Sequence, residues 1–131
     1  MYALGIGCSN GDYTSNDLCF TYEKASNFKT LPTNYLTMCH RIDLTQFPGL
    51  PAFNPMALVH GEESLTIHRQ PQVDTEYTIT ETIVDCQDKK SGAMVVMQTE
   101  IKSKESGLID ATVQSGMFIR GLGGWTNQEA R

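Results

Sequence analysis

The chain has 131 residues, of which 40% are hydrophobic and 19% are charged, and its formal net charge is -5. This length allows one domain with a real hydrophobic core but not two, and the composition is ordinary for a globular protein. The acidic balance and the lack of a basic stripe argue against nucleic acids and anionic membranes as partners. A few local cations could still bind an anionic ligand, so acidic small molecules stay open as substrates.

The four cysteines are scattered along the chain and form no Cys-x-x-Cys pair. A zinc site needs clustered ligands, and a secreted disulfide scaffold needs a higher cysteine density. We therefore expect reduced, structural thiols, a reducing compartment and no bound metal. No signal-peptide pattern is visible, and no apolar run approaches the roughly 20 residues that a membrane span needs.

The first third of the chain predicts a helix end, a strand and a helix. Residues 2–7 resemble the last turns of a helix that a glycine stops. Leu18 to Lys24 alternates apolar and polar residues, which indicates a strand. Pro32 to Ile42 is the best helix candidate, because proline suits a first turn. An apolar stripe at helical spacing supports it: Leu31, Tyr35, Cys39 and Ile42.

Residues 43–55 carry three prolines and a glycine and predict a long loop, which four long alternating runs follow. Short, turn-like links separate these runs and favour consecutive antiparallel pairing. The predicted strands are Leu58 to Arg69, Thr75 to Asp85, Ala93 to Ser103, and Ile109 to Ile119.

One sheet face is apolar and one helix is available to cover it, so the economical arrangement wraps the sheet around that helix. This is an α+β architecture, the hot-dog fold, with an antiparallel sheet of about five strands. We expect residues 1–120 to form this single domain. The glycine-rich and then polar stretch at 121–131 predicts a flexible exit linker.

The most conspicuous polar cluster is His60-Gly61-Glu62-Glu63, at the start of a predicted strand. Strict alternation puts His60 opposite the apolar face, and His60 reaches the core side only if Gly61 breaks the register. Binding of a ligand, a domain interface and a purely structural role all stay open for His60. Glu62 and Glu63 point to opposite faces, so they cannot form a close acid/base pair.

Four segments stand in the same order and at similar spacing as in the type-2, R-specific enoyl-CoA hydratases, which are MaoC-like proteins. They cover nearly the whole chain: Tyr-Ala-Leu-Gly-Ile-Gly at 2–7, Phe-Lys-Thr-Leu-Pro-Thr at 28–33, Leu-Val-His-Gly-Glu at 58–62, and Phe-Ile-Arg-Gly-Leu-Gly-Gly-Trp at 118–125. The chain thus resembles this family, which includes the hydratase part of the peroxisomal multifunctional enzyme of fatty-acid β-oxidation.

The resemblance implies a role for the chain. Known eukaryotic members are double hot-dogs, in which the C-terminal unit carries the catalytic Asp and His within an Asp-x-Asn-Pro-x-His signature. The N-terminal unit has lost both residues and helps form the tunnel for the acyl chain. This chain resembles the N-terminal unit: Asn54-Pro55 is present, but Ala52 stands in the aspartate position and His60 follows Pro55 at the wrong spacing.

By this resemblance the chain is the half of the hydratase that binds fatty-acyl-CoA, with no catalytic residue of its own. Its partner would be a second hot-dog unit, it would need no cofactor beyond the coenzyme A thioester substrate, and its compartment would be the peroxisome or otherwise the cytoplasm. Residues 121–131 would lead toward the missing second unit.

The expected substrate-binding residues lie on the predicted helix, in the loop after it and at the start of the next strand. They are Tyr35, Leu36, Cys39, Phe53, Met56, His60 and Gly61. Two alternatives stay open. One is a hot-dog acyl-CoA thioesterase, which needs a carboxylate near the helix, although Pro32 to Ile42 contains none. The other is a non-enzymatic acyl-binding or dimerisation module.

Overall fold

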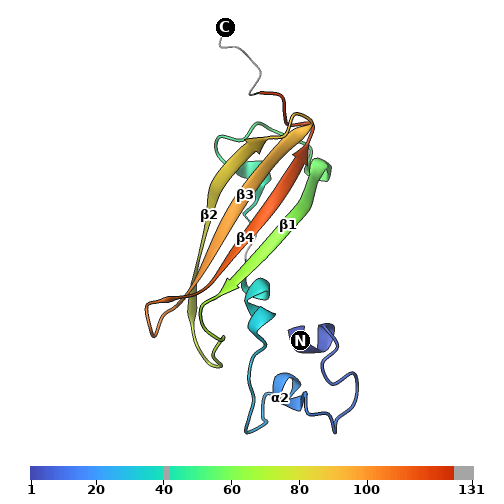
Figure 1. The fold of residues 1–131 in the computed structure, drawn as a ribbon, viewed down its shortest axis with the longest axis vertical. Helices are drawn as coiled ribbons and strands as arrows, with labels where there is room; N and C mark the ends of the chain where they lie inside the picture. Colours follow the sequence, from blue (N-terminus) through green and yellow to red (C-terminus); the bar gives the residue numbers. More distant parts are fainter. Residues whose placement is uncertain (40–41, 126–131) are drawn as a thin grey trace.

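The computed structural model describes residues 1–39 and 42–125. Its centre is a twisted antiparallel sheet of four long strands in the order β1-β4-β3-β2 (Figure 1). The strands are β1 (Leu58–Ile67), β2 (Tyr77–Asp88), β3 (Gly92–Ser103) and β4 (Ile109–Arg120). All four strands lie where the alternation of apolar and polar residues predicted them.

Consecutive pairing holds for β2 with β3 and for β3 with β4, but β1 pairs with β4 instead of β2. The prediction of consecutive pairing was therefore wrong for the first link, residues 68–76, which carries the chain from one edge of the sheet to the other. The backbone N–H groups of His68 and Arg69 donate to the carbonyl of Asp110, at 2.8 and 3.1 Å. These bonds hold the start of the link beside β4.

The predicted strand at Leu18 to Lys24 is wrong, because the chain forms a helical turn there, α2 (Leu18–Thr21). The backbone N–H groups of Phe20 and Tyr22 bond to the carbonyls of Asp17 and Leu18. Local bonds thus satisfy backbone groups that a strand would have to pair across a sheet. The sheet has four strands as a result, and α1 (Tyr2–Gly5) confirms the predicted helical segment at the start.

The predicted helix at Pro32 to Ile42 is shorter and tighter than expected: η1 (Pro32–Met38) is a 3₁₀ helix, and Cys39 after it is extended. Thr37 donates its hydroxyl to the carbonyl of Asn34, at 2.8 Å. Threonine and asparagine favour such local bonds and are weak helix formers. The predicted helix also includes residues 40 and 41, which lie outside the described residues.

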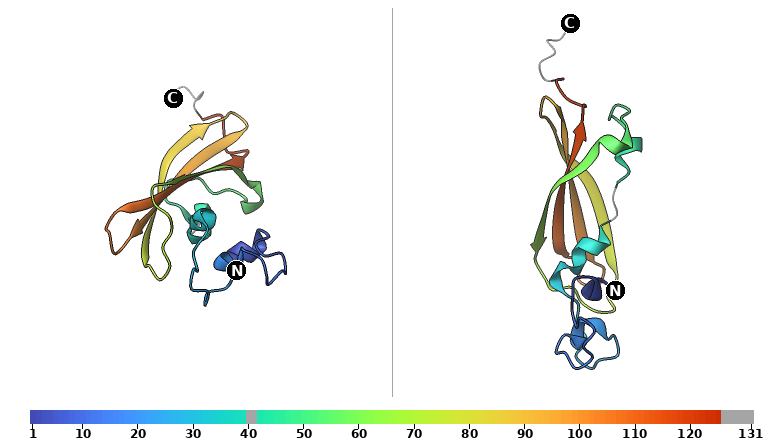
Figure 2. Two further views of the ribbon diagram at one scale, coloured as in Figure 1. Left: turned by 60° about the horizontal axis from the view of Figure 1, so that its bottom comes forward. Right: turned by 90° about the vertical axis from the view of Figure 1, so that its right-hand side faces the viewer.

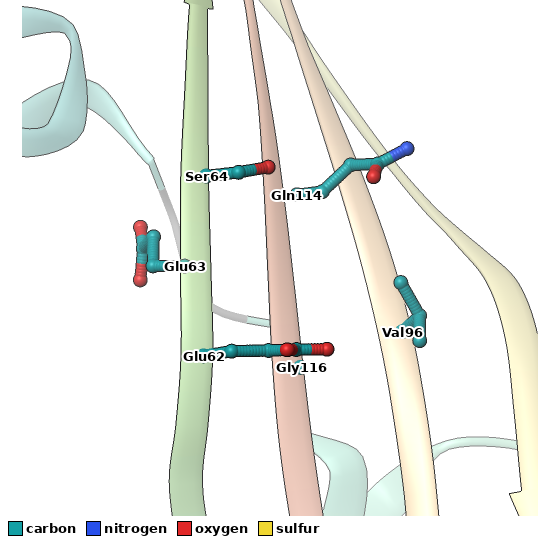
Figure 3. Close-up of a pocket in the computed structure, with 6 residues that line it drawn as sticks. All are labelled: Glu62, Glu63, Ser64, Val96, Gln114 and Gly116. Carbon is teal, nitrogen blue, oxygen red and sulfur yellow. The ribbon is translucent and has the colours of Figure 1, made fainter.

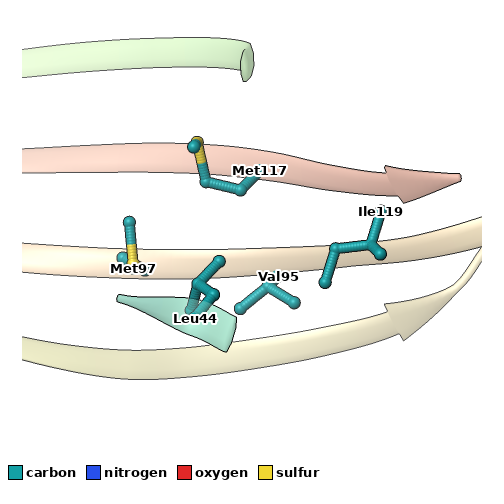
Figure 4. Packing of buried hydrophobic residues seen from close by; sticks show 5 residues of the cluster. All are labelled: Leu44, Val95, Met97, Met117 and Ile119. Carbon is teal, nitrogen blue, oxygen red and sulfur yellow. The ribbon is translucent and has the colours of Figure 1, made fainter. Parts of the chain in front are cut away.

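The helix η1 and residues 42–57 lie on one face of the sheet (Figure 2), which we call the covered face. Two apolar clusters form there. The first joins Leu44 of η2 (Leu44–Gln46) to Val95, Met97, Met117 and Ile119 of the sheet (Figure 4). The second joins Tyr35 of η1 to Ile101 and Ala111. Leu44 is 2% exposed, although the sequence placed it in a loop.

Residues 121–125 after β4 are hydrogen-bonded to neighbouring parts of the sheet, whereas residues 126–131 of the predicted linker lie outside the described residues. The N–H of Gly121 donates to the carbonyl of Ser91 and the N–H of Gly124 donates to Oδ1 of Asp88, both at 2.8 Å. These bonds fasten the segment to the turn between β2 and β3. They also fix the direction in which the chain leaves the sheet.

Candidate functional site

A β-bulge at Gly61 turns His60 onto the covered face. The register of β1 against β4 shifts between His60, which lies opposite Met117, and Glu62, which lies opposite Gly116. Residues directly opposite each other in an antiparallel pair share a face, and Met117 belongs to the first apolar cluster. Gly61 therefore breaks the alternation, and His60 reaches the core side by the route that the sequence left open.

The imidazole of His60 contacts the carboxylate of Glu63 on this face. Its Nε2 lies 2.7 Å from Oε2 of Glu63, and the two side chains keep 38% and 28% of their exposure. Glu63 lies opposite Ser115 and points away from Glu62 and Ser64 (Figure 3). The two adjacent carboxylates thus occupy opposite faces, as the alternation predicted.

Glu62 occupies the other, uncovered face, where its side chain lies across Gly116 (Figure 3). A Cβ atom at Gly116 would come within 2.6 Å of Cγ of Glu62, so a glycine is needed for this position of the carboxylate. A hollow of about 270 Å³ opens beside it. Its lining is mainly polar: Glu62, Glu63, Ser64, Val96, Gln114 and Gly116.

Tyr35 sits deepest among the predicted substrate-binding residues and is fully buried. Its hydroxyl donates to the carbonyl of Arg69 at 3.2 Å, and its ring meets Tyr77 edge-on, with centroids 5.9 Å apart. Burial, followed by the neighbouring Tyr77, raises the pKa of the Tyr35 phenol well above its usual range. These contacts make Tyr35 a support of the core between η1 and the sheet.

The other predicted residues do not gather in one place. Leu36 and Cys39 are half-buried on and after η1, and Cys39 packs against the second cluster. Phe53 packs against the first cluster, at the other end of the covered face. Met56 lies on η3 (Pro55–Ala57) and is 79% exposed.

Asn54 and Pro55 form the start of the short 3₁₀ helix η3. The side chain of Asn54 accepts a hydrogen bond from the N–H of Met56 at 3.0 Å and caps η3, whose first residue is Pro55. Ala57 occupies the position two after Pro55, where the catalytic signature has histidine. The pair thus has a structural explanation in this chain.

Sequence reasoning missed three polar residues on the covered face, namely Glu81, Thr99 and Ser115. Thr99 is 5% exposed, and it lies opposite Glu81 of β2. Ser115 lies opposite both Glu63 and Met97. The signal was in the sequence, because each of these residues interrupts the apolar alternation of its strand.

Metal-binding and membrane-spanning features do not emerge from the described part of the chain. Within residues 1–39 and 42–125, no group of three or more His, Cys, Asp and Glu side chains is arranged to hold a metal ion. No helix in the same part combines the length and apolar character of a membrane span. The four cysteines all lie within this described part of the chain, and none of them forms a disulfide.

Comparison with known proteins adds independent observations. The family model described as the MFE-2 hydratase 2 N-terminal domain matches residues 1–121. The chain is 31% identical over 129 residues to a probable enoyl-CoA hydratase 2 of Dictyostelium discoideum, covering 95% of this chain and 42% of that protein. It is 32% identical over 129 residues to the mouse peroxisomal multifunctional enzyme type 2, covering 95% of this chain and 17% of that enzyme.

A solved structure agrees with these relatives. The MaoC-like dehydratase from Phytophthora capsici superimposes with a TM-score of 0.72 at 32% identity, over 94% of this chain and 42% of that one. The chain thus spans less than half the length of these relatives and of this structure. Fold, family model and relatives agree, and the chain belongs to the family of the MFE-2 hydratase 2 N-terminal domain, whose members are hot-dog, MaoC-like units of enoyl-CoA hydratases.

Proposed function

We propose that the chain is the substrate-binding half of an R-specific 2-enoyl-CoA hydratase, or 3-hydroxyacyl-CoA dehydratase, of fatty-acid β-oxidation. A second hot-dog unit would supply the acid and the base. The observation that carries the proposal is the state of the signature segment: Ala52 and Ala57 stand where the catalytic unit has aspartate and histidine. The remaining Asn54 caps η3.

The chemistry of the reaction supports this division of labour. Adding water to an enoyl thioester needs one positioned group to activate the water and protonate the α carbon, and donors for the developing enolate oxygen. Neither alanine can exchange a proton. His60 has an imidazole, but it lies on a strand beyond η3 and its Nε2 is engaged by Glu63.

The covered face supports acyl binding. Leu36, Cys39 and Phe53 are half-buried, and of these Phe53 packs against the first apolar cluster and Cys39 against the second. We propose that these three side chains, with Met56, His60 and Gly61, contact the acyl chain, and that Tyr35 supports them from below. The exposed Met56 would contact it where the second unit closes over η3. The substrate is a coenzyme A thioester, no further cofactor takes part, and the compartment is the peroxisome, as the names of several relatives support.

Titration calorimetry with decanoyl-CoA and with free coenzyme A tests the acyl-binding half of the proposal. The chain should bind decanoyl-CoA more tightly than coenzyme A. Phe53→Ala should weaken decanoyl-CoA binding about tenfold, because the half-buried ring would lose only part of the roughly 1.5–3 kcal/mol that full burial of a phenylalanine provides. Leu108→Ala is the matched control, since Leu108 is 51% exposed between β3 and β4. Equal binding of both ligands, or an equal loss in both variants, would argue against acyl binding.

A further inference from the structure

The uncovered face of the sheet carries an apolar row over which no helix of the described residues lies (Figure 2). Strand pairing places Val59, Phe118 and Met94 side by side on this face, with Val96 next to Met94 in the alternation of β3. Val59 is 42% exposed, and the other three side chains are half-buried. A sheet face that meets only water normally carries polar residues at such positions.

Three glycines make this apolar row flat. The ring of Phe118 lies where a side chain at Gly92 would stand, since a Cβ atom there would come within 2.5 Å of the ring. The side chain of Met94 reaches over Gly116 and Gly61, whose Cβ atoms would come within 3.2 and 3.4 Å of it. Both long side chains therefore lie along the sheet instead of standing out from it. A flat apolar surface of this kind suits packing against a second sheet, as in β-sandwiches.

Charged side chains flank the apolar row along the strands. On one side, the exposed Lys89 and Lys90 belong to the turn between β2 and β3. On the other side, Glu62 lies on β1 and Glu100 lies on β3, with Lys102 one step beyond it in the alternation. A basic turn, an apolar row and acidic positions thus follow one another along this face.

A two-fold axis that crosses the strands at Val95 makes the face complementary to itself. Such an axis turns one copy end over end on the other, so that Met94 of each copy lies over Val96 of the other. Lys90 and Glu100 are equally far along the chain from Val95, so the same rotation brings Lys90 of each copy to Glu100 of the other. The contact occurs twice, because a two-fold interface is isologous. Lys102 then projects past the turn of the second copy and meets no lysine.

We infer that the uncovered face is the surface on which two copies of this chain pack back to back, sheet against sheet. The occupant is a second copy because an apolar row then meets an apolar row, and a basic turn meets an acidic position. The second copy also covers the hollow of about 270 Å³ beside Gly116. The unpaired edges of β1 and β2 and the covered face stay free, so the inference does not depend on acyl binding or on a second hot-dog unit.

Sedimentation velocity of the chain at micromolar concentration tests the inference, and the unmodified chain should be a dimer. Glu100→Lys and Lys90→Glu should each raise the dissociation constant of the dimer about tenfold or more, because each variant brings like charges together twice. An equimolar mixture of these two variants should dimerise again, since both contacts then join opposite charges. The matched control, Lys24→Glu, reverses an exposed charge far from this face and should leave the dimer intact.

The apolar row is tested by Met94→Lys, which should give a monomer. Thermal unfolding checks that each variant folds. A monomeric unmodified chain would overturn the inference, and so would a dimer that persists in Met94→Lys and in both charge variants, because it would use another surface. A mixture of the charge variants that associates no better than either variant alone would overturn the two-fold arrangement.

Discussion

At the scale of single residues, Tyr35 connects η1 to the sheet through the start of the link between β1 and β2. It is fully buried, and its hydroxyl donates to the carbonyl of Arg69. Because burial raises the pKa of the Tyr35 phenol, the folded chain holds the neutral form more strongly than the unfolded chain does. An unfolded tyrosine ionises near pH 10. Tyr35 thus contributes stability that is fully present below about pH 10 and is lost as the pH rises further.

Replacing Tyr35 by phenylalanine should lower the free energy of unfolding by about 1 kcal/mol at pH 7, because the hydrogen bond to Arg69 is lost. The difference between the two proteins should shrink above pH 10, since the variant has no phenol to ionise on unfolding. Urea unfolding at neutral and alkaline pH measures both effects. Tyr13→Phe is the control, because Tyr13 is 83% exposed. A difference that grows with pH would contradict this account.

Gly123 allows the closest backbone contact of the exit segment. A Cβ atom there would lie 2.6 Å from the nitrogen of Gly92 and from the carbonyl oxygen of Lys90, both of which are backbone atoms. Gly123→Ala should therefore detach the segment from the turn between β2 and β3 and cost about 1–3 kcal/mol. Gly5→Ala, where a Cβ meets nothing within 4 Å, should change stability little. Equal midpoints of thermal unfolding would show that the segment is not fastened.

At the scale of elements, the bulge at Gly61 sets which side chains of β1 face the core. Inserting one more glycine after Gly61 would shift the alternation by one residue and move Leu58 and His60 to the uncovered face. We expect a loss of about 1–3 kcal/mol in urea unfolding, because Leu58 would leave the first cluster. Gly61→Ala keeps the bulge, and its Cβ would approach the oxygen of Gly116 to 3.3 Å, so it should cost less than about 1 kcal/mol. An insertion as mild as the alanine variant would refute the role of the bulge.

The long strands could be predicted from sequence because each carries an alternation sustained over ten to twelve residues. The segment Leu18 to Lys24 is too short for alternation to exclude a helical turn, and the structure forms one, α2. In η1, the threonines and Asn34 weaken the α-helix that the apolar stripe predicted. Apolar periodicity predicts which face of a segment is buried. It does not predict the length of a helix that is rich in weak helix formers.

The candidate site was less predictable than the strands. The sequence suggested a break of register at Gly61 as the alternative to strict alternation, because a glycine within a strand often marks a bulge. The polar residues Glu81, Thr99 and Ser115 of the covered face were not recognised, since they lie on different strands whose pairing a single sequence does not reveal. Glu63 lies opposite Ser115 because β1 pairs with β4. This pairing of β1 with β4 requires the link at residues 68–76 to cross from one edge of the sheet to the other.

At the scale of the whole molecule, the chain exposes unpaired strand edges and apolar side chains, which another protein usually covers. Each outer strand, β1 and β2, has one edge that pairs with no other strand of the described residues. Several large apolar side chains of the first segment are also exposed: Leu4, Ile6, Tyr13 and Tyr22. Unpaired edges and apolar patches favour association.

We therefore predict that the chain associates, either with a second hot-dog unit or with another copy of itself. Sedimentation velocity at micromolar concentration should show a dimer, or a one-to-one complex when a hot-dog unit with the Asp-x-Asn-Pro-x-His signature is added. Such a unit should displace the homodimer if both use the same surface. A stable monomer that ignores the added unit would contradict the prediction.

We predict that this chain binds the substrate of a hydratase without carrying out the reaction. The test is a hydration assay with crotonyl-CoA and decenoyl-CoA, which follows the loss of absorbance of the conjugated enoyl thioester. The chain alone should hydrate neither substrate above background, because each missing acid or base costs about 100- to 10,000-fold. Activity toward decenoyl-CoA should appear when a unit with the Asp-x-Asn-Pro-x-His signature is added. Robust turnover by the chain alone that His60→Ala abolishes would contradict the account and make His60 catalytic.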